Sequence, residues 1–321
     1  MRIFADANYP FLSWRRKAYL VSLLFLVVGI GAMGMNIASL GSWLNYGVDF
    51  AGGTLVHVDF EEQVEADQIR AVNSAWQISR FGEASESEYL IRTPTFEDQL
   101  SADAAAGVAE GLEEAFGPGA FTVVRTEAVS ARVGDELQQR ALLAILISFV
   151  LTLAYIAFRF EWRFGVAAII ATAHDILITL GFIAALRMEI SVATVAAFLT
   201  IVGYSLNDTI VVFDRVRENL AKRMRGISYA AIIDRSINET LPRTVLTSGT
   251  TLTTLLSLYL FGGAVIRDFA LVLILGIVIG TFSSIVVASP ALAAIEAKWP
   301  HVVKKSTGGS GPARRRETAV V

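Results

Sequence analysis

The 321-residue chain contains no cysteine and only three histidines, and these shortages exclude several kinds of site. Without cysteine there is no disulfide framework, no thiolate metal site and no cysteine nucleophile. The histidines are His57, His174 and His301, which are too far apart in sequence for the usual clustered ligand spacing. We therefore expect no metal site and no bound cofactor. The net charge of -3 gives no reason to expect nucleic acid as a partner.

Long apolar runs dominate the chain instead. Hydrophobic residues make up 54% of the sequence and the mean hydropathy is +0.55, which is too apolar for an ordinary soluble protein. A membrane-spanning helix needs about 20 mainly apolar residues. Six stretches qualify: 18–40, 138–158, 164–186, 190–213, 244–262 and 267–289. The first is not expected to be a cleaved signal peptide, because its apolar core is too long. The predicted fold is an integral membrane protein with a six-helix transmembrane bundle.

Lysine and arginine gather in alternate connections between these runs and so predict the orientation of the chain. Residues 1–17, the basic loop 214–243 and the tail 290–321 are predicted to be cytoplasmic, with disorder after about residue 300. Both termini then lie inside and residues 41–137 lie outside. The sequence predicts a multi-pass protein of the cell (inner) membrane.

The external segment 41–137 has the pattern of one small α+β domain between the first two spans. Alternating residues predict strands at 54–60, 88–93 and 120–129, and helical spacing predicts helices at 65–79 and 97–116. This order places the helices on one face of a sheet. No nucleophile and base occur at a recognisable catalytic spacing, so we expect a binding or mechanical module and not an enzyme.

An acid interrupts the fourth apolar run, where Asp208 follows Asn207. A carboxylate in hydrocarbon costs about 2.5–3.5 kcal/mol on insertion scales, so such an acid faces protein or water and usually moves an ion or binds something. Helical spacing places Gly203, Tyr204, Asn207 and Asp208 on one face, which must point into the bundle. A structural hydrogen bond between helices is the alternative. We predict that Asp208 and Asn207 belong to a proton relay.

Two further groups of polar residues lie in the apolar runs. The fifth run begins after Arg243 and carries a stripe of hydroxyls that includes Thr247 and Thr251. Such hydroxyls relay protons or hold water, or else they bond to carbonyls of the preceding turn. In the third run, His174 and Asp175 lie near mid-membrane. They are either a second relay or a buried pair that fixes the register of the helix.

A glycine-rich junction, GVDFAGG at 47–53, joins the first run to the external domain and contains Gly47, Asp49, Gly52 and Gly53. Glycine permits positive φ and close approach of another backbone. The segment is not a phosphate loop, because it has neither GxxxxGK[ST] nor GxGxxG between a strand and a helix. It is either a flexible junction or one about which the external domain moves as a body.

Four segments together resemble the SecF family, the smaller membrane subunit of the bacterial SecD–SecF complex. They are VGYSLNDTIVVFDRVREN at 202–219, GVDFAGG at 47–53, TVLTSGTTL at 244–252 and SSIVVASP at 283–290. The resemblance extends over nearly all of the chain up to about residue 298, and the tail beyond residue 300 matches nothing in it.

The resemblance implies an architecture similar to that of resistance-nodulation-division transporters. It implies that the chain pairs with SecD and uses the proton-motive force to assist preprotein movement through the SecYEG channel, which the SecA ATPase serves. Protons are then the coupling ion. The family's intramembrane acid falls on Asp208 and its fifth-span arginine falls on Arg243. Whether YajC binds stays open.

Two other functions compete with this one. The first is half of a resistance-nodulation-division exporter for small molecules or lipids. Against it, the external domain at 41–137 is small, and six spans make only half of such a transporter. The second is a structural assembly factor without an ion pathway, and the pairing of Asp208 with Arg243 speaks against it.

Overall fold

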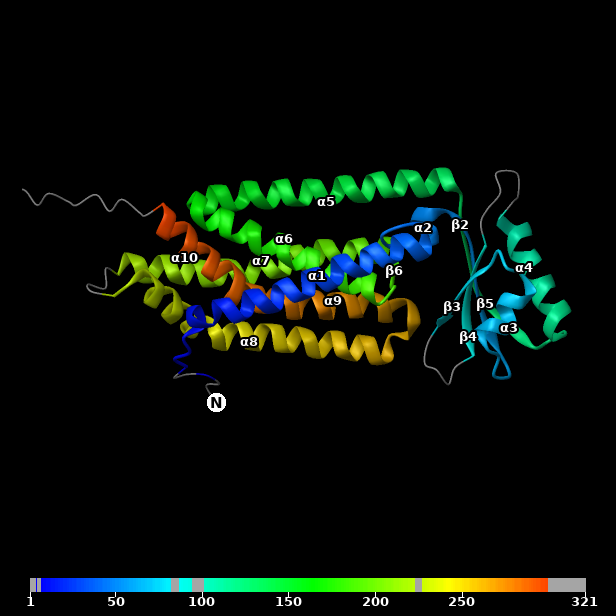
Figure 1. Cartoon of the computed structure of the whole chain (residues 1–321). Helices are drawn as coiled ribbons and strands as arrows, with labels where there is room; N and C mark the ends of the chain where they lie inside the picture. Colours follow the sequence, from blue (N-terminus) through cyan, green and yellow to red (C-terminus); the bar gives the residue numbers. More distant parts are fainter. Residues whose placement is uncertain (1–3, 5–6, 82–86, 94–100, 223–226, 300–321) are drawn as a thin grey trace, which may run out of the picture.

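The computed structural model describes residues 4, 7–81, 87–93, 101–222 and 227–299 (Figure 1). Six of the described helices are long and apolar enough to cross a membrane, and an α+β domain lies between the first and second of them. The predicted fold class is therefore confirmed. The predicted disordered tail after residue 300 lies outside the described residues.

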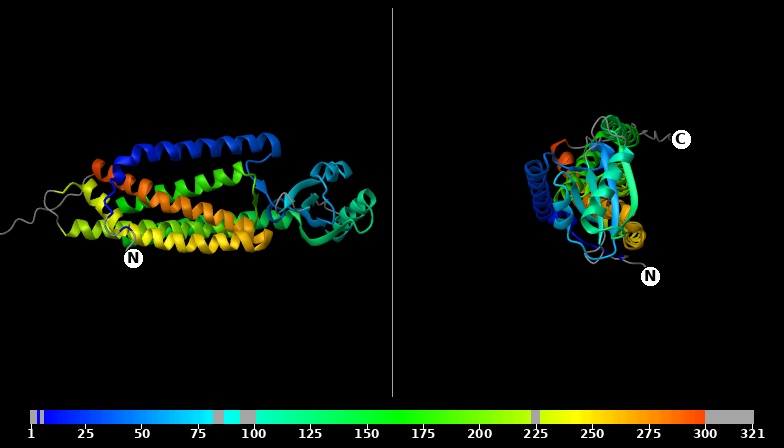
Figure 2. Two further views of the ribbon diagram at one scale, coloured as in Figure 1. Left: turned by 90° about the horizontal axis from the view of Figure 1, so that it is seen from below. Right: turned by 90° about the vertical axis from the view of Figure 1, so that its right-hand side faces the viewer.

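The membrane domain is built from long helices that run side by side (Figures 1 and 2). The helical segments of this domain, long and short, are η1 (Phe11–Trp14), α1 (Arg15–Leu40), α5 (Ala131–Arg159), α6 (Trp162–Ala185), α7 (Val192–Ala221), α8 (Tyr229–Phe261), α9 (Gly263–Ser283), the π-helical segment η2 (Ser284–Ala288) and α10 (Ser289–Lys298). The external domain stands at one end of this bundle, and the N-terminus and α10 lie at the other (Figure 1).

The most buried helices of the bundle are α6, α7 and α9. Glycines let α9 approach α7 closely, because a Cβ at Gly276 would lie 2.2 Å from Ile201 Cδ1 and one at Gly280 would lie 2.9 Å from Ser205 Cβ. Small residues at four-residue spacing are the usual means of such close packing in membranes. Large apolar side chains cover the outer faces of α1 and α5, as hydrocarbon surroundings require.

The external domain is a four-stranded antiparallel sheet with strand order β3-β4-β2-β5. Its elements are β2 (Gly53–Phe60), α3 (Ala66–Val72), β3 (Gln77–Phe81), β4 (Glu88–Thr93), α4 (Ser101–Phe116) and β5 (Phe121–Val129). Both helices cover the face that points away from the bundle (Figure 1). The core between them and the sheet includes Val58, Ile69, Tyr89 and Leu112.

The predicted helix at 65–79 was wrong in its second half. Helix α3 ends at Val72, because Asn73 adopts an extended conformation and its Oδ1 accepts a hydrogen bond from the amide of Ala75. An asparagine that bonds to its own backbone in this way competes with helix continuation. Strand β3 follows, and its buried Ile78 lies between exposed Gln77 and Ser79, which is the period of a strand.

A second, smaller sheet joins the external end of the bundle to the chain that leaves α1. Strand β1 (Asn45–Tyr46) pairs in parallel with β6 (Glu189–Ile190), which lies between α6 and α7. The short helix α2 (Val48–Ala51) follows β1 and leads into β2. The glycine-rich junction is therefore a structured segment held against the membrane domain.

Candidate functional site

Asp208 lies inside the bundle, where α7, α8 and α9 meet. Only 3% of the residue is exposed. Ser248 on α8 donates a hydrogen bond from its Oγ to Asp208 Oδ2 at 3.4 Å, and the same hydroxyl lies 2.8 Å from Thr281 Oγ1 on α9. The acid is therefore buried within the bundle and bonded to Ser248, which links it to Thr281 on the next helix.

A short chain of hydroxyls leads away from Asp208. Tyr204, one turn earlier on α7, donates from its phenol to Ser248 Oγ and to Thr251 Oγ1, both at 3.4 Å. Thr251 Oγ1 in turn donates to the carbonyl of Thr247 at 2.9 Å. Thr247 donates to the carbonyls of Arg243 and Thr244 on its own helix, which favours the structural alternative for its hydroxyl.

Arg243 and Asn207 lie near Asp208 but do not bond to it. No hydrogen bond or ion pair joins either residue to Asp208 within the part of the chain that the structure describes. Asn207 is exposed on the surface of α7. Arg243 lines a polar cavity of about 610 Å³ toward the end of the bundle opposite the external domain, together with Val211, one turn after Asp208 on α7.

Asp175 forms a second buried acidic cluster, between α6, α7 and α9. It is fully buried, and its Oδ2 accepts hydrogen bonds from Ser205 on α7 and from Ser283 on α9 at 2.5 and 2.7 Å. Its Oδ1 lies 2.9 Å from His174 Nδ1. His174 Nε2 is buried and has no partner among the described residues. These bonds favour a role in fixing the register of three helices.

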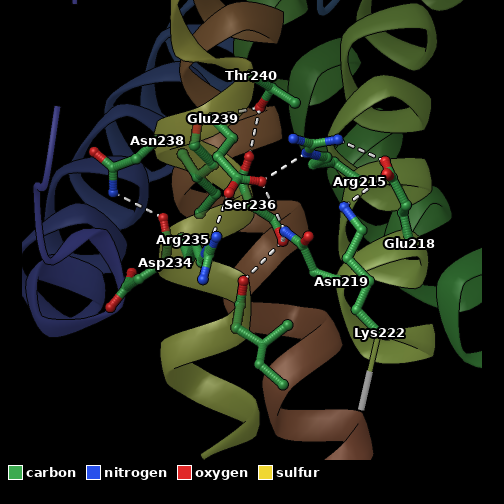
Figure 3. A network of polar contacts seen from close by, with 12 residues as sticks. Arg215, Glu218, Asn219, Lys222, Asp234, Arg235, Ser236, Asn238, Glu239 and Thr240 are labelled. Atoms are coloured by element: carbon green, nitrogen blue, oxygen red, sulfur yellow. Dashed lines mark hydrogen bonds and ion pairs between the residues drawn. The ribbon is translucent and has the colours of Figure 1, made fainter. Parts of the chain in front are cut away.

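A network of ion pairs, whose members Arg215 and Glu239 also line the cavity, holds α7 and α8 together (Figure 3). Glu239 on α8 accepts hydrogen bonds from Arg215 Nε at 2.6 Å and from Asn219 Nδ2 at 2.8 Å, both on α7. It also accepts one from Arg235 Nε at 2.7 Å on its own helix. Since Glu239 lies one turn before Arg243, this network fixes where Arg243 enters the cavity.

The N-terminal segment is tied to the same end of α8. Asn238 bonds to both backbone groups of Tyr9, accepting from its amide at 2.8 Å and donating to its carbonyl at 2.9 Å. Asp234 Oδ1 accepts from the amide of Leu12 at 2.8 Å. The start of α8 is therefore anchored on two sides.

The glycine-rich junction makes specific contacts at the external end of α7. Asp49 Oδ2 accepts a hydrogen bond from the amide of Val192, the first residue of α7, at 2.9 Å. Gly52 and Gly53 have φ values of 70° and 117°, which favour glycine. A Cβ at Gly47 would lie 2.3 Å from the Glu189 carboxylate. These contacts oppose the interpretation of the junction as a free linker.

Glu189 connects this junction to the external domain. Its Oε1 lies 2.8 Å from Nη2 of Arg92, which belongs to β4. Burial raises the pKa of Glu189 above its ordinary value, Arg92 opposes this, and the nearby charges of Asp49 and Asp268 add to it. Burial has the larger effect on this pKa, so ionisation of the Glu189 carboxyl has a cost that Arg92 only partly offsets.

The chain matches two models of known families. One is described as "Protein export membrane protein SecD/SecF, C-terminal" and matches residues 109–298, and the other is the SecD/SecF GG Motif, which matches residues 37–64. The SecF translocase subunit of Gemmatimonas aurantiaca is 43% identical over 320 residues, with 96% of this chain and 93% of the relative covered. That of Escherichia coli is 37% identical over 309 residues, with 94% and 93% covered.

The chain belongs to the SecF family. The solved SecDF of Thermus thermophilus, a translocon-associated membrane protein, superposes with a TM-score of 0.79 at 38% identity. The match covers 92% of this chain and 40% of that one, so the chain spans about two fifths of the longer protein. As a SecF, the chain is a non-enzymatic subunit of a protein translocase, and family membership implies the cytoplasmic membrane.

Ser248, Thr281, Glu239, Glu189 and Arg92 were not predicted as site residues. For Glu239 a signal was present, since Arg235 and Arg243 lie four residues to either side of it. For Ser248 a signal was present as well, since it belongs to the hydroxyl stripe of the fifth run. Thr281, Glu189 and Arg92 carried no such signal, because their partners lie on other elements. Asp208 accepts its hydrogen bond from Ser248, whereas Thr247 donates to a backbone carbonyl of α8.

Asp49→Asn is expected to lower the pH at which Glu189 titrates, because asparagine keeps the cap on α7 but removes a neighbouring negative charge. Titration of labelled glutamate carboxyls by ¹³C NMR, assigned with Glu189→Gln, measures this. Because the folded-state pKa is raised, the stability of wild type relative to Glu189→Gln falls as pH rises through that pKa. Asp59→Asn, which removes a charge elsewhere in the external domain, is the control. An unchanged Glu189 titration in Asp49→Asn would contradict the assigned cause.

Proposed function

We propose that this SecF pairs with SecD and uses the proton-motive force to assist preprotein movement through the SecYEG channel that SecA serves. Asp208 is the group that takes up and releases the proton. The observation that carries this proposal is an acid buried within the bundle that accepts a hydrogen bond from Ser248, whose hydroxyl also contacts Tyr204 and Thr281. Protons are the coupling ion.

The surroundings of Asp208 suit both of its charge states. A neutral carboxyl group is compatible with the burial of the residue, and an ionised one accepts a hydrogen bond from Ser248. Arg243 carries a permanent charge, because guanidinium does not deprotonate under working conditions. A guanidinium that moves toward the acid favours its ionised form, and one that moves away favours its protonated form.

The cavity below Asp208 supplies a route to the cytoplasm. It holds about 610 Å³ and its lining includes the charged groups of Asp214, Glu218 and Glu239 as well as Arg243. Water fills such a polar space readily. A proton leaving Asp208 then has a short distance to cross, past Val211, before it reaches ionisable groups in contact with water.

The surface of α7 supports SecD as the partner. Gly203 and Asn207 are exposed on a helix that crosses the membrane, and Thr250 and Thr254 are exposed on α8. Polar groups at membrane depth are rarely left facing lipid, so a second membrane protein is needed to cover them. The SecDF of Thermus thermophilus combines both halves in one chain, and this chain covers 39% of that relative.

The energy available is adequate for a conformational bias. One proton that crosses 100 mV releases about 2.3 kcal/mol, which shifts a two-state equilibrium roughly fiftyfold. The exporter alternative loses ground, because curated relatives that match nearly the whole chain are protein translocase subunits. YajC remains an open partner of the proposed complex.

Asp208→Asn is expected to assemble with SecD and yet lose the gradient-dependent stimulation of preprotein export, because asparagine keeps the shape and cannot exchange a proton. Export into membrane vesicles with and without a proton gradient measures this, with co-purification of SecD as the check on assembly. Asp67→Asn, on the exposed helix α3, is the control and keeps full stimulation. Wild-type stimulation in Asp208→Asn would refute the assignment.

Arg243→Lys is expected to impair gradient-driven export while membrane insertion stays normal. If Arg243 sets the charge state of Asp208, it does so with the length and the forked donor geometry of its guanidinium, which lysine lacks. If Arg243 only anchors the helix by the positive-inside rule, lysine serves nearly as well. The same vesicle assay measures it. Arg16→Lys at the start of α1 is the matched control, since Arg16 is exposed and basic at the same side of the membrane. Full activity of Arg243→Lys would make Arg243 an anchor.

A further inference from the structure

We infer that Arg92, Glu189 and Asp49 are positioning residues that transmit movement of α7 to the external domain. The inference rests on the proposed function, since it assigns the path by which a change at Asp208 reaches the outside. In this inference the glycine-rich junction connects α7 mechanically to the external domain, and Arg92 is the residue of the domain that makes the contact.

Arg92 joins the external sheet to the membrane domain by side-chain contacts. Its Nη2 lies 2.8 Å from Glu189 Oε1, and its Nη1 donates to the carbonyl of Tyr46 at 2.9 Å. The side chains are only 14% exposed for Arg92 and 25% exposed for Glu189. Water cannot replace one partner of a largely buried ion pair without loss of stability, because the charge of the other partner is then buried and uncompensated.

Glu189 is itself held in place by backbone contacts. Its strand β6 pairs in parallel with β1, and the amide of Gly47 donates to the carbonyl of Ile190 at 2.9 Å. The carboxylate passes over Gly47 at a distance that leaves no room for a side chain there. The position of the Glu189 carboxylate is therefore set by the junction and not by the freedom of its side chain.

Asp49 fastens the same junction to the first residue of α7. Its carboxylate accepts from the amide of Val192 at 2.9 Å, at the end of the helix where negative charge is favoured. Helix α7 then runs without interruption to Ala221 and carries Asp208 sixteen residues after Val192. At 1.5 Å per residue this is about 24 Å of continuous helix, so a shift at Asp208 moves its external end as well.

A second attachment, to α5, determines how such a shift moves the external domain. Helix α2 packs against the start of α5, where a Cβ at Gly134 would lie 2.9 Å from the carbonyl oxygen of Phe50. Helix α5 continues directly from β5, the strand at the other edge of the sheet from β3. The domain is thus joined to α5 through β5 and to β6, the strand before α7, through the Arg92–Glu189 pair. Relative movement of these two helices therefore rotates it.

The absence of cysteine allows a direct distance measurement. Spin labels are attached at Glu114→Cys on α4 and at Phe261→Cys, which is 86% exposed at the external end of α8, in the complex with a cysteine-free SecD in liposomes. In the otherwise wild-type chain we expect a narrow distance distribution that shifts when a proton gradient is applied. Arg92→Gln and Glu189→Gln should each broaden it and abolish most of the shift and of the stimulated export.

The combined variant Arg92→Gln with Glu189→Gln is expected to behave like either single variant, because both remove the same contact. Arg70→Gln is the matched control. Arg70 lines one cleft together with Arg92 and Glu189 but pairs with Asp67 within the external domain. Its loss should therefore leave the distances unchanged. Co-purification of SecD shows that each variant assembles.

A narrow distribution that still shifts with the gradient in both Arg92→Gln and Glu189→Gln would overturn the inference. Failure of the proposed function gives a different result. If Asp208→Asn retained the gradient-dependent shift and the stimulation, Asp208 would not be the proton carrier. The broadening caused by Arg92→Gln would still show that this contact positions the domain.

Discussion

The structure depends on keeping one carboxyl group, that of Asp208, away from lipid. This requirement explains why α7, α8 and α9 meet where they do. Ser248 on α8 donates a hydrogen bond to the acid and is itself in contact with Thr281 on α9. The glycines of α9 let that helix come close enough to α7 to close the site. The buried Asp175 cluster fixes α6 and α9 against α7 one turn away, through Ser205 and Ser283.

The same helix reaches both surfaces of the membrane. At its C-terminal end α7 is joined to α8 by Glu239 and lines the cavity that Arg243 also lines. At its external end it is capped by Asp49 and adjoins the strand that carries Glu189. A rigid element with an ionisable group in its middle and defined contacts at both ends is suited to convert a change of charge into movement.

The sequence was sufficient for features that depend on local pattern. Apolar length predicted six spans, and an acid inside one of them pointed to Asp208. Features that depend on contacts between distant residues were out of reach. Asp49 and Val192 are 143 positions apart, and nothing near either residue marks the other. The helix predicted at 65–79 failed because the apolar spacing of Ile69, Val72 and Trp76 outweighed the helix-ending Asn73, whose effect depends on its backbone conformation. Thr247 and Ser248 are neighbours of similar chemistry, and only the rotation of α8 decides that Ser248 faces the acid.

The proposed coupling depends on the passage of a proton through Asp208. Proton flux into liposomes that contain the complex with SecD, followed with an enclosed pH-sensitive dye under an imposed gradient, tests this passage most directly. We expect flux above that of empty liposomes for the wild-type chain and flux equal to that of empty liposomes for Asp208→Asn. Equal flux through the wild-type and Asp208→Asn complexes would contradict it.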